Sequence, residues 1–186
     1  QYKEFLEESK KGVLEESYKA KLAFEAFQHT ADYDTAISNW ISKKRGLQSS
    51  KYIESYPLIK TLRYGENPHQ KAYWYGLSNI GWNSAEQLQG KELSYNNLLD
   101  LESALSTVIE FGYEKKSNFE SKSFAAVILK HNNPCGASIS NSLSNSFKNA
   151  LKCDPISAFG GIVAFNANVD EETARHLKDI FLECVV

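Results

Sequence analysis

A lysine and a histidine stand side by side at the end of an apolar run in this chain. Residues 124–129 read Phe-Ala-Ala-Val-Ile-Leu, and Lys130, His131, Asn132 and Asn133 follow them. A short apolar run bounded by breakers is typical of a strand buried on both faces. Open α/β sheets bind ligands at the carboxyl ends of such strands. A cation, an imidazole and two amides therefore lie where a small-molecule site would be, although a polar turn that only closes the strand is an equally weighted alternative.

A second polar cluster, Leu-Arg-Tyr-Gly-Glu-Asn-Pro-His-Gln at residues 62–70, also combines groups that bind ligands. Arg63 can bind an anion through its planar guanidinium group. Tyr64 offers a ring for stacking and a hydroxyl for hydrogen bonding, and Gly65 allows a ligand to approach the backbone. These groups are suited to ligand contacts at the end of a strand.

Two further clusters leave their alternatives open. Residues 90–97 read Gly-Lys-Glu-Leu-Ser-Tyr-Asn-Asn and precede a helix that we expect to begin at Leu98. Such a helix start suits a phosphate or carboxylate, but ordinary N-capping by Asn97 explains it equally well. Gly160 and Gly161 indicate either close approach of a ligand or a simple tight turn.

Composition limits the classes of partner. The net charge of −2 gives no electrostatic reason to expect nucleic acid or an anionic membrane. No signal peptide and no apolar run that could span a bilayer is visible. The 3 cysteines are widely spaced and include no Cys-x-x-Cys pair, so we expect a cytoplasmic protein without a disulfide framework or a structural zinc site. The chain contains no Met, which indicates a piece of a longer protein.

The first part of the chain has a helical pattern. Residues 4–11 are highly charged, and Gly12 is a plausible stop. From residue 18 to 45 apolar residues recur at spacings of three and four, which predicts one long helix or two that meet near 30–34. His29 lies in this stripe and is predicted to be a packing residue rather than a ligand. Residues 46–50 form a connector.

After the connector, short strands alternate with helices. The pattern predicts strands at 56–63, 71–75, 124–129, 161–165 and 181–186. It predicts helices at 98–111 and 143–151, and a third that begins after the N-cap residue Asp170. This alternation is typical of an α/β layer with mostly parallel strands.

Together these clusters closely resemble one enzyme family. The segments at 62–70, 130–136 (Lys-His-Asn-Asn-Pro-Cys-Gly) and 154–163 are similar to the transformylase half of the bifunctional purine biosynthesis enzyme. That enzyme joins phosphoribosylaminoimidazolecarboxamide formyltransferase to inosine monophosphate cyclohydrolase. Residues 22–34 resemble the last helices of the family's cyclohydrolase domain, so the resemblance covers nearly the whole chain in one order.

The resemblance implies a fold and a domain arrangement. The fold would be α/β, a cytidine-deaminase-like transformylase layer preceded by the C-terminal helices of a methylglyoxal-synthase-like cyclohydrolase domain. Residues 1–50 would be the C-terminal helical part of the cyclohydrolase domain and the connector. Residues 51–186 would be the N-terminal part of the formyltransferase domain. The chain would then be an internal fragment of a homodimeric enzyme.

The resemblance also implies a reaction. A formyl group passes from the co-substrate 10-formyltetrahydrofolate to the 5-amino group of aminoimidazole carboxamide ribotide, and the attached cyclohydrolase domain closes the ring to inosine monophosphate. His131 would accept the proton of the attacking amine, and Lys130 would stabilise the charge on the formyl oxygen. The implied substrate contacts are Arg63, Tyr64, Gly160, Glu183 and, more weakly, Asn97. No metal is implied in this segment, and the folate contacts would lie beyond Val186.

Two other functions compete with this prediction. A zinc deaminase needs His-x-Glu and Pro-Cys-x-x-Cys, whereas Asn132 and Asn133 follow His131, and Cys135 has no second Cys at that spacing. An inactive fragment that serves only in dimer assembly is the other alternative, because the long helical segment could pack against another chain. In isolation the fragment is expected to be inactive.

Overall fold

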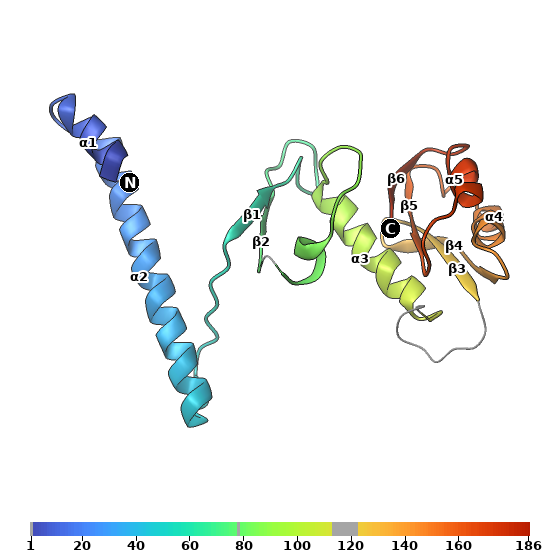
Figure 1. Ribbon diagram of the computed structural model, residues 1–186, viewed down its shortest axis with the longest axis horizontal. Coiled ribbons are helices and arrows are strands. Elements are labelled where there is room, and N and C mark those ends of the chain that lie inside the picture. The colour runs from blue at the N-terminus through green and yellow to red at the C-terminus, as the bar shows by residue number, and fades with distance from the viewer. Residues whose placement is uncertain (1, 78, 113–122) are drawn as a thin grey trace. The chain divides into compact units, whose positions relative to one another are not determined.

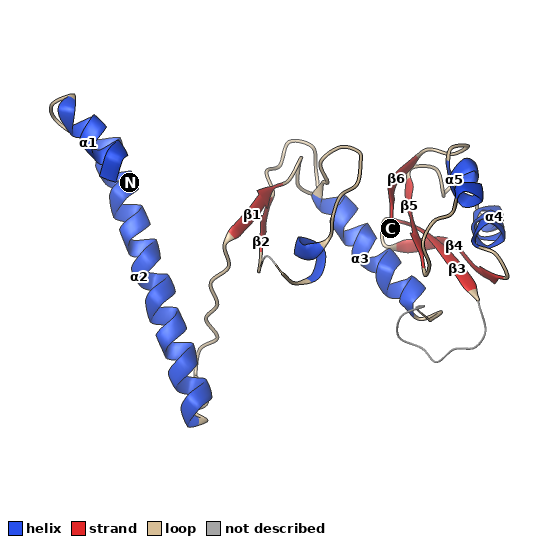
Figure 2. Cartoon of the chain, viewed as in Figure 1, coloured by secondary structure: helices blue, strands red, loops and turns tan. Residues whose placement is uncertain are grey.

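The computed structural model describes residues 2–77, 79–112 and 123–186. Contacts between Cα atoms divide the chain into two compact units, 1–57 and 58–186. The first unit contains only helices and loops, and the second combines strands with helices (Figure 2). The predicted change of pattern after the connector is therefore confirmed.

The first unit consists of α1 (Tyr2–Lys10) and α2 (Glu16–Arg45) (Figure 1). Helix α2 runs without interruption, so the apolar stripe forms one helix rather than two. It ends at Gly46, whose φ of 63° is left-handed and whose N–H donates to the Ser42 carbonyl. Neither helix contains a buried residue. The prediction that His29 is packed was therefore wrong, since its side chain is exposed in this chain.

The second unit opens with a small antiparallel pair of strands. Strand β1 (Leu58–Thr61) pairs with β2 (Tyr73–Tyr75), and the 62–70 cluster forms most of the connection between them. The short 3-10 helix η1 (Gly81–Ser84) follows. These strands are shorter than predicted but lie within the predicted ranges.

The main sheet contains β3 (Phe124–Lys130), β4 (Asn133–Ser140), β5 (Gly161–Phe165) and β6 (Leu182–Val185) in the order β4-β3-β5-β6. Strand β3 is antiparallel to both β4 and β5, and only β5 and β6 are parallel. The prediction of mostly parallel strands was wrong. Strand β4 was not predicted, because Pro134 and Gly136 suggested that the chain leaves the sheet there, whereas the ladder accommodates both at an edge.

Helices cover both faces of the sheet (Figure 1). Residues along β3 alternate between two apolar clusters, one shared with α3 (Tyr95–Ile109) and one with α4 (Leu143–Cys153). Ala125, Val127 and Leu129 face α3, while Ala126 and Ile128 face α4. A strand buried on both sides reads as a continuous apolar run, which is why the sequence predicted it correctly. The short helix α5 (Glu171–Leu177) lies beside α4.

Gly136 lets β4 approach α4 closely. A Cβ atom at this position would lie 2.0 Å from the carbonyl oxygen of Ala150 and 2.9 Å from its carbonyl carbon. Real Cβ contacts are never this short, and the obstacle is backbone, so a side chain here would force the strand and the helix apart.

We therefore expect Gly136→Ala to destabilise this layer by roughly 2 kcal/mol or more through overpacking. Hydrogen exchange of the purified protein should become faster in β4 and α4. The exposed neighbour Ala137 gives a matched control, since Ala137→Ser should change stability by less than about 0.5 kcal/mol. Equal protection in the two variants would contradict this close packing.

Candidate active site

His131 lies in a two-residue turn between β3 and β4. Lys130 pairs with Asn133 across the hairpin, so only His131 and Asn132 form the turn. Both have positive φ angles, 52° and 58°, as the type I′ turn of a tight hairpin requires. The His131 side chain is exposed. The turn therefore presents an imidazole at the carboxyl end of a buried strand, as the sequence predicted.

Lys130 is held against the start of β5. Its Nζ donates a hydrogen bond of 2.7 Å to the carbonyl oxygen of Phe159. The next residue, Gly160, has a φ of 72° and donates its N–H to the Phe181 carbonyl at 2.8 Å. A Cβ at Gly160 would lie 3.9 Å from the Lys130 Nζ, so the ammonium group and this backbone are neighbours.

The antiparallel pairing explains why Lys130 and Gly160 meet. Leu129 pairs with Ile162, so the end of β3 lies beside the beginning of β5. The sequence argument expected this edge to be formed by the carboxyl ends of parallel strands. The expectation of parallel carboxyl ends was wrong, because β5 contributes its amino end to this edge.

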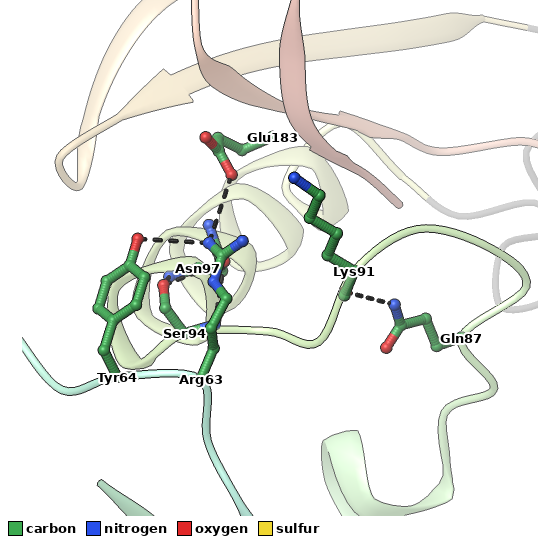
Figure 3. A network of polar contacts seen from close by, with 7 residues as sticks. All are labelled: Arg63, Tyr64, Gln87, Lys91, Ser94, Asn97 and Glu183. Carbon is green, nitrogen blue, oxygen red and sulfur yellow. Dashed lines mark hydrogen bonds and ion pairs between the residues drawn. The ribbon is translucent and has the colours of Figure 1, made fainter. Parts of the chain in front are cut away.

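Arg63 and Tyr64 are fixed against the beginning of α3. The Arg63 N–H donates to the Leu93 carbonyl at 3.1 Å, and the Tyr95 N–H donates to the Tyr64 carbonyl at 3.2 Å. The Arg63 guanidinium lies 4.9 Å from the centre of the Tyr64 ring and donates to its hydroxyl at 3.3 Å (Figure 3). These contacts hold the cation and the ring as one unit.

Glu183 of β6 faces the same guanidinium group (Figure 3). Its Oε2 lies 3.9 Å from Nη2 of Arg63, with side chains that are 32% exposed for Arg63 and 38% for Glu183. An ion pair with this separation and this much solvent exposure contributes at most about 1 kcal/mol to the stability of the fold. Both groups therefore retain hydrogen-bonding capacity for a ligand.

Asn97 lies beneath this cluster in a capping box (Figure 3). The Asn97 N–H donates to the Ser94 hydroxyl at 3.2 Å, and the Asn97 Oδ1 accepts from the Ser94 N–H at 3.0 Å. Ser94 is therefore the N-cap, and the expectation that Asn97 caps a helix beginning at Leu98 was wrong. Both side chains are buried. A phosphate contact by Asn97 stays a prediction.

Strand β6 places the group around Arg63 next to the start of β5, where Lys130 meets Gly160. Glu183 lies between Leu182, which pairs with Gly161, and Cys184, which pairs with Ile162. The Arg63–Tyr64–Glu183 group is thus adjacent to the strand that begins at Gly160 and Gly161. The structure brings the predicted residues to one edge, although it gives no direct contact between the His131 imidazole and Arg63 among the described residues.

Two polar residues near this edge were not selected from the sequence. The Lys91 side chain extends in the same direction as that of Arg63, toward the strands (Figure 3). Its position within the polar cluster 90–97 was the signal that could have identified it. Asp100 of α3 accepts hydrogen bonds from the backbone of His131 and Asn132, and no local pattern indicates such a long-range contact.

Two cysteines near the site lie in surroundings that favour the neutral thiol. Burial raises the pKa of the Cys184 thiol to about 11, and the nearby Glu183 carboxylate acts in the same direction. Burial, with Asp154, also raises the pKa of the Cys135 thiol, which Lys130 partly opposes. Zinc binds the thiolate form. Among residues 2–77, 79–112 and 123–186, no cluster of three or more His, Cys, Asp or Glu side chains is arranged to hold a metal ion.

None of the described helices is long and apolar enough to cross a lipid bilayer.

Comparison with known proteins identifies the family. The model of the AICARFT/IMPCHase bienzyme family matches residues 1–186. Among curated proteins, the bifunctional purine biosynthesis protein PurH of Prochlorococcus marinus subsp. pastoris strain MED4 is 83% identical over the whole chain. The proteins of the same name from P. marinus strains MIT 9301 and MIT 9211 are 82% and 59% identical over the same length. The chain spans 36% of the length of each of these relatives. With a family match over its full length, the chain belongs to the AICARFT/IMPCHase bienzyme family.

Proposed function

We propose that this chain forms part of a formyltransferase site that acts in de novo purine biosynthesis. The proposed reaction transfers the formyl group of 10-formyltetrahydrofolate to the 5-amino group of aminoimidazole carboxamide ribotide. The observation that carries the proposal is the Lys130–His131 pair at the sheet edge that also holds Gly160 and Glu183. Relatives named as bifunctional purine biosynthesis proteins support it.

Under this proposal His131 acts as the proton acceptor. The amine of the ribotide is a weak nucleophile, because its lone pair is delocalised into an imidazole ring that carries a carboxamide. The amine must lose a proton as the new C–N bond forms, and a neutral histidine is suited to accept it at neutral pH. The protonated imidazole can return that proton to the folate nitrogen as its bond to the formyl carbon breaks and tetrahydrofolate leaves. His131 has the exposure that this role needs, and no hydrogen bond or ion pair engages its imidazole in the described part of the chain.

Lys130 is proposed to stabilise the tetrahedral intermediate. The formyl oxygen gains negative charge as the amine attacks, and a fixed cation lowers the energy of that state. The hydrogen bond to the Phe159 carbonyl restrains the Lys130 ammonium group. Since an ammonium group has more than one N–H donor, the remaining donors stay available for the oxyanion.

Arg63, Tyr64 and Glu183 are proposed to bind the ribotide. A guanidinium fork can bind anionic oxygen atoms, and a tyrosine ring can stack on a heterocycle. The Glu183 carboxylate only accepts hydrogen bonds, so it suits hydroxyl or amino groups of the substrate. The cation held over the ring, 4.9 Å from its centre, supports a shared role for Arg63 and Tyr64. Asn97 remains a weaker candidate for the phosphate end.

The domain arrangement is also a proposal. We assign residues 1–50 to the end of a methylglyoxal-synthase-like cyclohydrolase domain and residues 51–186 to the start of a cytidine-deaminase-like formyltransferase domain. The mixed strands with helices on both faces are compatible with the second assignment. Folate contacts, ring closure to inosine monophosphate and dimerisation would then depend on parts of a cytoplasmic enzyme that correspond to the rest of the relatives' length.

A role in assembly alone is the second candidate. It is favoured by the exposed apolar side chains on α2, which include Phe24, Phe27, Tyr33 and Trp40. The isolated chain would then dimerise without turnover. Light scattering combined with an assay of the full-length enzyme distinguishes the two candidates, because a catalytic role requires that substitutions at the sheet edge change turnover but not association.

Replacing His131 by Ala in a full-length enzyme tests the catalytic proposal. The MED4 relative with this sequence in place of its matching part is a suitable host, called here the chimeric enzyme. We expect kcat for formyl transfer to fall by about 10²–10⁴-fold, the usual contribution of a general base. Cyclohydrolase activity on formylated ribotide should be unchanged. His176→Ala on α5 is the matched control, and full formyl transfer by the His131 variant would overturn the assignment.

Replacing Arg63 by Ala tests the binding role separately. Loss of a charge-assisted hydrogen bond costs about 1.5–3 kcal/mol, so KM for the ribotide should rise by roughly 10- to 100-fold, with a smaller change in kcat. Steady-state kinetics of the chimeric enzyme measures both. Arg175→Ala removes an exposed arginine that pairs only with Glu171 among the described residues and should leave KM unchanged. A similar KM in the two variants would rule out substrate binding by Arg63.

A further inference from the structure

We propose that Asp100 is a positioning residue that fixes the backbone of the His131 turn. This inference rests on the proposed function, because it matters for turnover only if His131 acts on the substrate. Asp100 lies in α3, on a different element from the hairpin that carries His131. Its carboxylate contacts the main chain of the turn rather than the imidazole.

The turn needs such support because of its sequence. A type I′ turn requires positive φ at both central positions, and Asn-Gly is the preferred pair. Here the positions are occupied by His131 and Asn132, with φ angles of 52° and 58°. Asn and His adopt this region more readily than most residues do, but both are less favourable there than Gly, so the turn depends on support from its surroundings. Sparsely populated backbone conformations of this kind tend to occur at functional sites.

The Asp100 carboxylate supplies the enforcing contacts. Its Oδ2 accepts a hydrogen bond of 3.2 Å from the His131 N–H, and its Oδ1 accepts one of 2.8 Å from the Asn132 N–H. Both residues lie outside the strand ladder, which ends at the Lys130–Asn133 pair, so the ladder offers their N–H groups no partner. One side chain therefore satisfies the two residues whose φ angles are unusual.

The Asn132 side chain adds a second tether to the same helix. Its amide group lies 2.8 Å from the hydroxyl of Ser103. When the Asn132 amide is oriented with its nitrogen toward α3, that nitrogen donates to the Asp100 Oδ1 at 3.3 Å and to the Leu99 carbonyl oxygen at 3.2 Å. This orientation gives a hydrogen-bond donor to the Asp100 Oδ1 and to the Leu99 carbonyl oxygen, both of which can only accept.

Helix α3 is a rigid platform for these contacts. Leu101 and Ala104, which follow Asp100 within the next turn of the helix, are buried against the sheet. The carboxylate therefore has a fixed position relative to β3, and the two hydrogen bonds transmit that position to His131. Because a displacement of about 1 Å at a catalytic group can reduce turnover by roughly 100-fold, loss of the carboxylate should affect kcat.

The first test is Asp100→Ala in the chimeric enzyme. We expect kcat for formyl transfer to fall by about 10- to 100-fold, while KM for the ribotide stays within about threefold, since Asp100 lies outside the proposed binding group. Cyclohydrolase activity should be unchanged, and an unchanged KM for the ribotide reports that the formyltransferase domain is folded. Glu110→Ala, at the other end of α3, is the matched control and should leave kcat unchanged. If the Ala variant does not fold, the isosteric Asp100→Asn keeps one acceptor and should show a smaller fall in kcat.

Rescue distinguishes a positioning role from a general loss of stability. Glycine adopts positive φ freely, so adding Asn132→Gly to Asp100→Ala should restore kcat by at least about tenfold. Asn133→Gly lies outside the positive-φ pair and should restore nothing. Absence of rescue, a change in KM alone, or an unchanged kcat in Asp100→Ala would each overturn the inference.

The His131→Ala variant separates this inference from the proposed function. If His131→Ala loses formyl transfer and Asp100→Ala does not, only the positioning role is wrong. If His131→Ala keeps full activity, the proposed function fails, and the role of Asp100 in turnover fails with it.

Discussion

The antiparallel alignment of β3 with both of its neighbours is the constraint on which the candidate site depends. It returns the chain through a tight turn at His131 and Asn132, and it brings the start of β5 beside the end of β3. The approach is close, since a Cβ at Gly161 would lie 2.7 Å from the Leu129 carbonyl oxygen. A lysine, a histidine and a glycine-bounded backbone segment can therefore share one sheet edge, although Lys130 and Phe159 are far apart in the sequence.

The same constraint connects packing to chemistry. Alternate residues of β3 bury apolar side chains against α3 and α4, so the strand cannot shift without exposing both clusters. Helix α3 in turn carries the Asp100 carboxylate to the turn and begins at the capping box next to Arg63 and Tyr64. A single buried strand and a single helix thus fix the positions of most of the polar groups at this edge.

Much of this arrangement could be predicted from local sequence, and the rest depends on long-range pairing. Apolar runs and helical spacing correctly predicted β3, β5 and α4, and therefore that Lys130 and His131 lie at the end of β3, whereas the contact with Asp100 was not predicted. Strand direction could not be predicted, because a strand buried on both faces has the same apolar pattern in either orientation. The stripe of α2 predicted a helix correctly but not its burial, since a pattern does not show what covers it.

The measurement that tests the central claim most directly is a structure of the chimeric enzyme with the aminoimidazole ribotide bound. The account predicts that the 5-amino group lies about 3 Å from a ring nitrogen of His131, within reach of the proton transfer. It also predicts that the ribotide contacts Arg63, Tyr64 or Glu183. A ribotide bound elsewhere, or an amine separated from His131 by more than about one bridging water, would contradict the account.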